Sequence, residues 1–243
     1  MTDLLTLCKE LKSKKWVNLS HQIKEDSPRF PALPALEKKD IFTLADGFHV
    51  QQFSVVGQYG THIDAPIHFV EGGRWLEELD LKDLLLPLVV IDKSQEVAEN
   101  PDYILRKQDI VDFEAEHGAV PEGAFVAFRS DWSKRWPSQE QMRNLDEQDI
   151  QHTPGWGRDA LEFLIHERGV KAVGHETFDT DAGVPAAASG LVNEYYLLEQ
   201  DIYQVEVLAN LDQLPATGAL ISIAFPNWEQ ATGSPVRALA ILP

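Results

Sequence analysis

The stretch from Gly57 to Phe69, GQYGTHIDAPIHF, constrains the fold and the chemistry of this chain more than any other. If its first half is extended, the two-residue period of a strand places one set of residues on a single face: Gln58, Gly60, His62 and Asp64. That face carries an amide oxygen, a gap without a side chain, an imidazole and a carboxylate. Nitrogen and oxygen ligands that converge in this way suit a divalent metal, and the glycine leaves room for the ion to approach.

The second half of the stretch predicts a turn. Pro66 cannot extend a central strand, so we expect the chain to turn there and to carry His68 back over the same site. A metal needs three or four ligands, so others must come from elsewhere in the chain. The alternative interpretation is a strand and turn whose histidine and aspartate only satisfy hydrogen bonds.

The motif resembles the hallmark H-x-G-T-H-x-D-x-P-x-H of the cyclase-like metal-dependent hydrolases, the family of the kynurenine formamidase and isatin hydrolase type. The chain matches it except that Gln58 replaces the first histidine. The resemblance implies that a small amide, lactam or lactone is hydrolysed by metal-activated water. It also implies one α/β domain over residues 1–243, a swivelling β/β/α fold with a mixed central sheet or barrel.

The same resemblance implies a second group of ligands far downstream. The family has H-x-x-L-L and, twelve residues after the histidine, a glutamate that binds metal; here Glu194 opens the matching E-Y-Y-L-L and Glu206 falls at that distance. Glu206 lies in an expected strand, where an acid among apolar neighbours is costly to bury unpaired, and a cation would remove that cost. The alternative is that both are ordinary surface carboxylates.

The departures from the family pattern affect the metal. Gln58 and Glu194 stand where the family has histidines, so nitrogen ligands become oxygen ligands. This change favours Mn²⁺ over Zn²⁺, although Zn²⁺ remains compatible, and it leaves open whether one ion or two are bound. His175 could restore a nitrogen ligand or could simply pack beside Glu176.

Two aromatic residues are candidates for the substrate pocket through the resemblance. Phe30 falls at the aromatic position of the family's P-x-W-P loop, and Trp132 lies in a segment similar to the family's T-G-W. The alternatives are an aromatic residue that staples a proline-rich loop for Phe30, and a partly buried surface aromatic for Trp132.

His68 is the expected proton carrier, as the matching histidine is in the family, because an imidazole can both accept and donate a proton near neutral pH. A serine hydrolase is the first rival, but the chain has no G-x-S-x-G motif. The other rival is a non-catalytic member of the same fold that binds a metal or a small ligand. The replacements at Gln58 and Glu194 favour that rival, whereas the presence of His68 argues against it.

The charge balance bounds the partners. Lys and Arg number 21 against 39 Asp and Glu, a formal charge of −18. Such a surface repels phosphate backbones and anionic lipid, so we expect a small-molecule substrate and neither nucleic-acid nor membrane partners. The resemblance implies a homodimer or homotetramer. The single cysteine, Cys8, and the lack of a secretory leader predict a cytoplasmic protein.

Hydrophobic periodicity and turn signals predict the elements. The expected strands cover residues 16–21, 48–56, 84–92, 125–129, 170–174, 203–207, 219–225 and 237–242, and the expected helices cover 2–16, 76–83, 107–117, 158–168 and 193–198. Within the second strand, Phe53 and Val55 are candidate core residues. Residues 138–150 are polar and are expected to form an exposed helix or loop.

Overall fold

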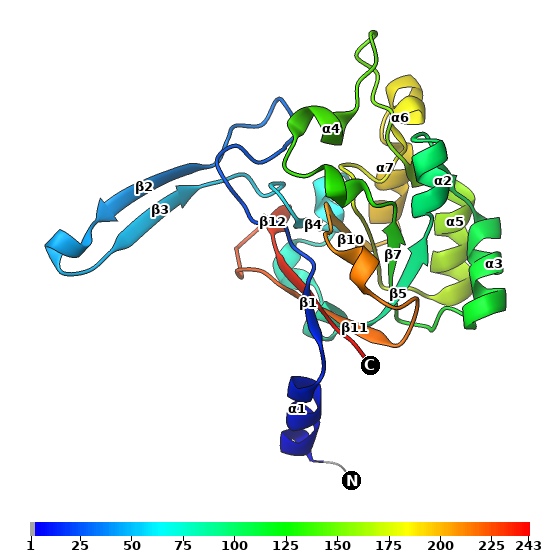
Figure 1. The fold of residues 1–243 in the computed structure, drawn as a ribbon, viewed down its shortest axis with the longest axis horizontal. Coiled ribbons are helices and arrows are strands. Elements are labelled where there is room, and N and C mark those ends of the chain that lie inside the picture. Colours follow the sequence, from blue (N-terminus) through cyan, green and yellow to red (C-terminus); the bar gives the residue numbers. More distant parts are fainter. Residues whose placement is uncertain (1–2) are drawn as a thin grey trace.

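A computed structural model describes residues 3–243 of the chain (Figure 1). The helices are α1 (Leu4–Ser13), α2 (Ser94–Glu99), α3 (Lys107–His117), α4 (Gln139–Arg143), α5 (Arg158–Glu162), α6 (Gly183–Ser189) and α7 (Val192–Glu199). The strands are β1 (Trp16–Asn18), β2 (Glu37–Phe42), β3 (Val50–Ser54), β4 (His62–Asp64), β5 (Leu85–Asp92), β6 (Ile104–Leu105), β7 (Phe125–Arg129), β8 (Gly155–Trp156), β9 (Ala172–His175), β10 (Tyr203–Glu206), β11 (Ala219–Ala224), β12 (Gly233–Pro235) and β13 (Arg237–Ile241).

One large mixed sheet organises the molecule. Its nine strands run in the order β1-β13-β11-β5-β7-β9-β10-β4-β12. The central block β5, β7, β9 and β10 is parallel, as expected for apolar strands joined through helices, while the strands on either side are antiparallel. The predicted α/β fold with a mixed central sheet is therefore confirmed.

The sheet curls until its two ends meet. β12 pairs with β4 at one end and β13 pairs with β1 at the other, yet only Val236 separates β12 from β13 in the sequence. Ser20, just after β1, also bridges to Leu208, just after β10. The curl brings the motif strand β4 close to chain segments from both halves of the sequence.

Apolar clusters cover both faces of the sheet. On the outer face, helices α3, α5 and α7 pack through residues such as Phe113, Leu161 and Leu197 (Figure 1). The inner cluster joins residues from opposite ends of the curled sheet, among them Val17 and Ile63. Gly174 on β9 leaves room for the inner cluster, because a Cβ there would lie 2.6 Å from the Phe125 ring and 2.8 Å from Leu208.

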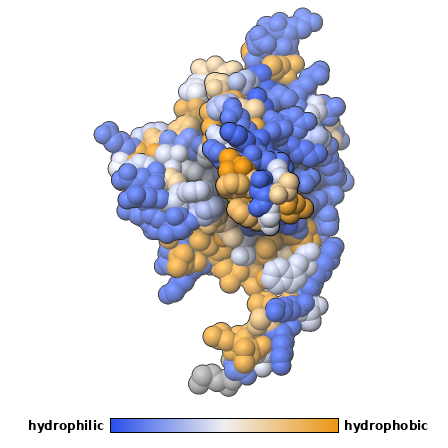
Figure 2. Space-filling model, turned by 90° about the vertical axis from the view of Figure 1, so that its left-hand side faces the viewer, coloured by the Kyte–Doolittle hydropathy of each residue, from blue (hydrophilic) through white to orange (hydrophobic). Residues whose placement is uncertain are grey.

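A two-stranded arm, β2 and β3, projects from the body, as Figure 1 shows at the left. Figure 2 views the molecule from this side and shows apolar side chains on the arm and on the surface below it. Phe53 and Val55 are 55% and 41% exposed, so their prediction as core residues is wrong. Their alternating pattern is real, but the strand has no second layer to cover it.

Most other predicted elements agree with the structure to within a few residues, but the expected helix at 76–83 is wrong: the segment forms two short 3₁₀ helices, Leu76–Glu78 and Leu81–Leu84. The expected N-terminal helix corresponds to α1, and Thr2, its expected first residue, lies outside the described residues. The expected helix at 158–168 is interrupted, because its second half, Phe163–Glu167, is a π-helix. No helix among residues 3–243 has both the length and the apolar character needed to cross a membrane.

Candidate metal centre

Two neighbouring strands bring the central side chains together. β4 runs antiparallel to β10, with His62 opposite Glu206 and Asp64 opposite Gln204. Residues opposite each other on adjacent strands point to the same face, so these four side chains form one cluster. The Nε2 atom of His62 lies 3.5 Å from Asp64 Oδ2 and 3.3 Å from Glu206 Oε2.

The orientation of His62 is set by its other nitrogen. Nδ1 lies 2.9 Å from the carbonyl oxygen of Gly60. A carbonyl can only accept a hydrogen bond, so Nδ1 carries the proton and donates it. The lone pair on Nε2 therefore faces two carboxylates. These three groups repel one another unless a cation or an extra proton lies between them.

Gly60 serves this geometry differently from the expectation. It has a left-handed φ of +64°, so the extended strand begins at His62 and does not run continuously from Gln58. A Cβ on Gly60 would meet the side chain of Ile23 and not the metal-binding face. The predicted gap for the ion at this glycine is thus wrong, and the glycine instead supplies the turn and the carbonyl that orients His62.

Gln58 reaches the cluster through that turn. Its Nε2 donates to Asp64 Oδ1 at 3.1 Å, so its nitrogen faces the carboxylate. Gly233 on β12 lies directly behind this contact: a Cβ there would lie 2.2 Å from Gln58 Nε2 and 2.9 Å from Asp64 Oδ1. This arrangement makes Gln58 a residue that orients Asp64.

A second group of potential ligands shares Asp64 with the first. It contains His68 and Glu194, and its donor atoms lie within 4.8 Å of one another, as do those of His62, Asp64 and Glu206. The predicted turn forms at Pro66–His68, a 3₁₀ helix that places His68 Nε2 3.9 Å from Asp64 Oδ1. Glu194 comes from the first turn of α7, and its Oε2 is buried without a hydrogen-bond partner among residues 3–243.

The electrostatics of the cluster call for a cation. Burial, and then Glu206, Asp179 and Asp64, raise the pKa of Glu194 well above its usual value. Burial and the neighbouring Glu206 raise the pKa of Asp179 to about 7. Burial opposes the charged form of His62, but Asp64 and Glu206 raise its pKa well above the ordinary value. Several acids that repel one another in a buried site are the donor set that binds a hard divalent ion.

His175 holds Glu206 from the opposite side. Its Nε2 lies 3.5 Å from Glu206 Oε1, while Trp156 Nε1 donates to its Nδ1 at 3.3 Å. The Glu206 carboxylate thus lies between two imidazoles, and although burial favours its neutral form, His175 and His62 lower its pKa. His175 does not belong to either group whose donor atoms gather, so it orients a ligand.

Sequence reasoning missed two residues of this cluster. The buried Gln204 donates to Asp64 Oδ2 at 3.3 Å and to Glu206 Oε1 at 3.0 Å. The available signal was its spacing, two residues before Glu206 on the same strand face. Asp179 follows β9, and no spacing rule links it to the motif.

A pocket of about 370 Å³ opens over the cluster. Its polar lining comes from the candidate metal ligands described above, and its apolar walls are formed by Phe30, Pro31, Leu33, Phe69, Phe178 and Leu191. Phe30 lies where the sequence placed it. Trp132 does not line this pocket, and that prediction is wrong: the side chain is buried in the core, where Nε1 donates to the Met142 carbonyl at 2.9 Å.

Comparison with known proteins identifies the family of this chain. The Cyclase family model matches residues 17–182, which include the whole motif. The chain belongs to the cyclase family. An isatin hydrolase of Roseibium aggregatum is 38% identical over 206 residues, covering 82% of this chain and 78% of that protein. A kynurenine formamidase of Geobacillus thermodenitrificans is 25% identical over 226 residues, covering 92% of this chain and 95% of the other.

Solved structures of isatin hydrolases have the same fold as this cyclase-family chain. Isatin hydrolase A from Labrenzia aggregata, bound to benzyl benzoate, superposes with a TM-score of 0.91 at 35% identity and covers 99% of both chains. Isatin hydrolase A from Ralstonia solanacearum gives 0.92 at 33% identity, covering 100% of this chain and 98% of that one. The chain is thus an enzyme, a metal-dependent hydrolase of the cyclase family, as the sequence predicted.

Proposed function

We propose that this chain hydrolyses a small aromatic amide or lactam, of the arylformamide or isatin type, with the aid of one divalent ion. The observation that carries the proposal is the convergence of His62, Asp64 and Glu206 from β4 and β10. These residues would hold the ion. A bound ion would supply activated water and would polarise the substrate carbonyl.

We propose one ion per chain, with Mn²⁺ preferred over Zn²⁺. The ligand set contains one imidazole and two carboxylates, and such oxygen-rich sets favour harder ions. A second ion would have to share Asp64 and occupy His68, which the reaction needs free. Two ions per chain after saturation with Mn²⁺, measured by atomic emission, would contradict this assignment.

His68 is the proposed proton carrier to the leaving nitrogen. Its ring is about a third exposed, at 29%, and it lies at the pocket wall beside Asp64. Gln58 would keep the Asp64 carboxylate in position, and Glu194 would contribute a further carboxylate beside Asp64 and His68.

His68→Ala tests this role. Loss of a general acid or base lowers turnover by about 10² to 10⁴-fold, so we expect kcat to fall by at least about 10²-fold while the metal content is unchanged. Full activity in this variant would exclude His68 from the proton transfer.

The substrate class rests on the pocket walls and on the relatives. Phe30, Phe69 and Phe178 favour a flat, aromatic substrate, and two relatives are named isatin hydrolase and kynurenine formamidase. Isatin, N-formylkynurenine and simple lactones should be assayed with Mn²⁺ and with Zn²⁺. Turnover that a chelator abolishes supports the proposal, whereas saturable binding without product under both metals would favour a binding protein.

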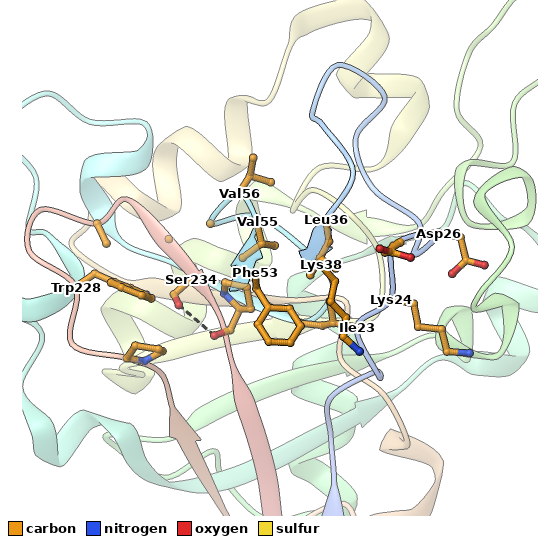
Figure 3. Close-up of a pocket in the computed structure, with 16 residues that line it drawn as sticks. Ile23, Lys24, Asp26, Leu36, Lys38, Phe53, Val55, Val56, Trp228 and Ser234 are labelled. Carbon is orange, nitrogen blue, oxygen red and sulfur yellow. Dashed lines mark hydrogen bonds between the residues drawn. The ribbon is translucent and has the colours of Figure 1, made fainter. Parts of the chain in front are cut away.

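We also propose that two copies of the chain associate through the arm. An isolated two-stranded hairpin is marginal in water, yet this one exposes Phe42, Phe48 and Phe53. At its base lies a groove of about 990 Å³, and Figure 3 shows the rings of Phe53 and Trp228 at its lining. Each copy offers both an arm and a groove, as a two-fold symmetric dimer requires.

Finally, we propose that the enzyme works in the cytoplasm. Its single cysteine, Cys8, is a free and exposed thiol, which an oxidising compartment would tend to modify. Recovery of Cys8 as a free thiol from intact cells would support this location, and recovery as a mixed disulfide would contradict it.

A further inference from the structure

Two arginines share the pocket with the metal-binding residues. Arg143 is the last residue of α4 and Arg29 lies in the loop before β2, and both line the pocket that holds His62 and Glu206. Neither was predicted as a site residue: Arg143 lies in a stretch, residues 138–150, with only a generic polar pattern, and in the loop of Arg29 only the neighbouring Phe30 was singled out. The pocket is therefore lined by both acidic and basic side chains.

The guanidinium of Arg143 lacks any partner in the described chain. Its Nε is buried without a hydrogen bond, and its side chain forms no ion pair within residues 3–243. This is unusual in a chain with 39 acidic against 21 basic residues. By contrast, Arg168 forms a two-pronged contact with Glu114, at 2.6 and 2.8 Å.

Arg29 forms hydrogen bonds with backbone carbonyls but also lacks an acidic partner among the described residues. Its Nε donates to the Leu33 carbonyl at 3.2 Å, and its Nη1 lies 3.5 Å from the Ser27 carbonyl. These contacts hold its stem against its own loop. Arg29 thus adds a second guanidinium to the lining of the same pocket.

A side-chain clamp joins the loop of Arg29 to the helix of Arg143. The amide of Gln139, at the start of α4, accepts from the Arg29 backbone N–H and donates to the Arg29 carbonyl, both at 2.8 Å. The loop of Arg29 and the helix of Arg143 thus form one unit. A preorganised pair of cations costs little to align when an anion binds.

We propose that Arg143 and Arg29 form an anion subsite and that the substrate carries a carboxylate in addition to its scissile amide. This inference rests on the proposed function. A partly buried arginine without a partner pays a desolvation cost that an anion would repay through charge-assisted hydrogen bonds. The two arginines would also offset the repulsion that a chain of charge −18 exerts on such a substrate.

The test compares formanilides that carry a ring carboxylate with the same compounds carrying an uncharged carboxamide. The ortho, meta and para isomers are all assayed, so that one of them spans the pocket. We expect the native enzyme to prefer the best acid over its carboxamide in kcat/KM by about 10-fold or more, the size of a charge-assisted hydrogen bond.

Two variants test whether Arg143 causes the preference for the acid. In Arg143→Gln the ratio of the two kcat/KM values should fall toward one, while Arg143→Lys should retain part of it. The control is Arg237→Gln, which removes an exposed arginine from β13, outside the pocket. An equal rate for acid and carboxamide in the native enzyme, or an unchanged ratio in Arg143→Gln, would overturn the inference.

A binding measurement separates this inference from the proposed function. Calorimetric titration of metal-free protein with the same ring-carboxylated formanilides needs no turnover. Binding that weakens by about 10-fold or more in Arg143→Gln supports the subsite even if no formanilide is hydrolysed. If the enzyme hydrolyses the neutral carboxamides but the carboxylated formanilides do not bind the metal-free protein, the hydrolase proposal stands and the anion subsite is refuted.

Discussion

At the residue scale, the site depends on small geometric devices around His62 and Asp64. The Gly60 carbonyl fixes the imidazole, and the absence of a side chain at Gly233 lets Gln58 reach Asp64. Both positions require glycine: a side chain at Gly233 would obstruct the site, and the backbone conformation of Gly60 favours glycine. The motif predicts the ligands, and these neighbours make the ligands point the right way.

Gly233→Ala should damage the metal site. The new Cβ would lie 2.2 Å from Gln58 Nε2, 2.9 Å from Asp64 Oδ1 and 2.8 Å from the Ile63 carbonyl oxygen, so both side chains and the β4 backbone would have to shift. We expect metal affinity to fall by about 10 to 100-fold, as for loss of an orienting partner. Calorimetric titration with Mn²⁺ measures this. Gly218→Ala is the control for general destabilisation, because its φ of +90° strains any Cβ while the Cβ would approach only Pro243, at 3.7 Å. Equal affinity in both variants would show that the close contact behind Asp64 is unimportant.

His21 should make the protein less stable in mild acid. Burial lowers the pKa of His21 from 6.5 to about 4 in the folded protein. As the pH falls below 6.5, His21 is protonated in the unfolded chain while it stays neutral in the folded protein. The free energy of unfolding is therefore highest above pH 6.5 and decreases as the pH falls toward 4. The loss should reach roughly 3 kcal/mol at most.

His21→Phe tests this pH dependence, because phenylalanine can keep the stack on Trp136, at 4.3 Å between ring centroids. Urea unfolding at pH 7 and pH 4.5 should show a smaller loss of stability in the variant than in the native protein. The same loss in both proteins would assign the acid sensitivity to other groups.

At the element scale, the strands were easier to predict than the surfaces they make. Apolar runs such as Phe125–Arg129 identify buried strands directly. The arm misled the prediction because Phe53 and Val55 alternate as in a core strand although no layer covers them. β12 was missed because its three residues, Gly233–Pro235, have no apolar pattern and are recognisable only through their pairing with β4.

The arm should control assembly. Phe48→Asp places a charge near the arm turn, on a side chain that is 53% exposed, and should convert the dimer to monomer with little change in the unfolding of the monomer. Light scattering during gel filtration measures the mass. Leu81→Asp, at an exposed leucine outside the arm, is the control and should stay dimeric. A native protein that is monomeric at micromolar concentration would refute the arm dimer.

At the scale of the whole molecule, the curled sheet joins ligands that lie far apart in the sequence. Glu206 becomes the neighbour of His62 only because β10 pairs with β4. The family resemblance predicted this partner, whereas periodicity alone could place Glu206 on a strand but not beside the motif. Gln204, Asp179 and Arg143 escaped prediction for the same reason, since their roles arise from packing between distant segments.

The metal content of the purified protein tests the central claim most directly. Native protein and Glu206→Gln, which keeps the shape of the side chain but removes its charge, are dialysed against Mn²⁺ and analysed by atomic emission. The account predicts close to one ion per native chain and a large loss in Glu206→Gln. A folded native protein that retains neither Mn²⁺ nor Zn²⁺, or a variant that retains as much as the native protein, would contradict it.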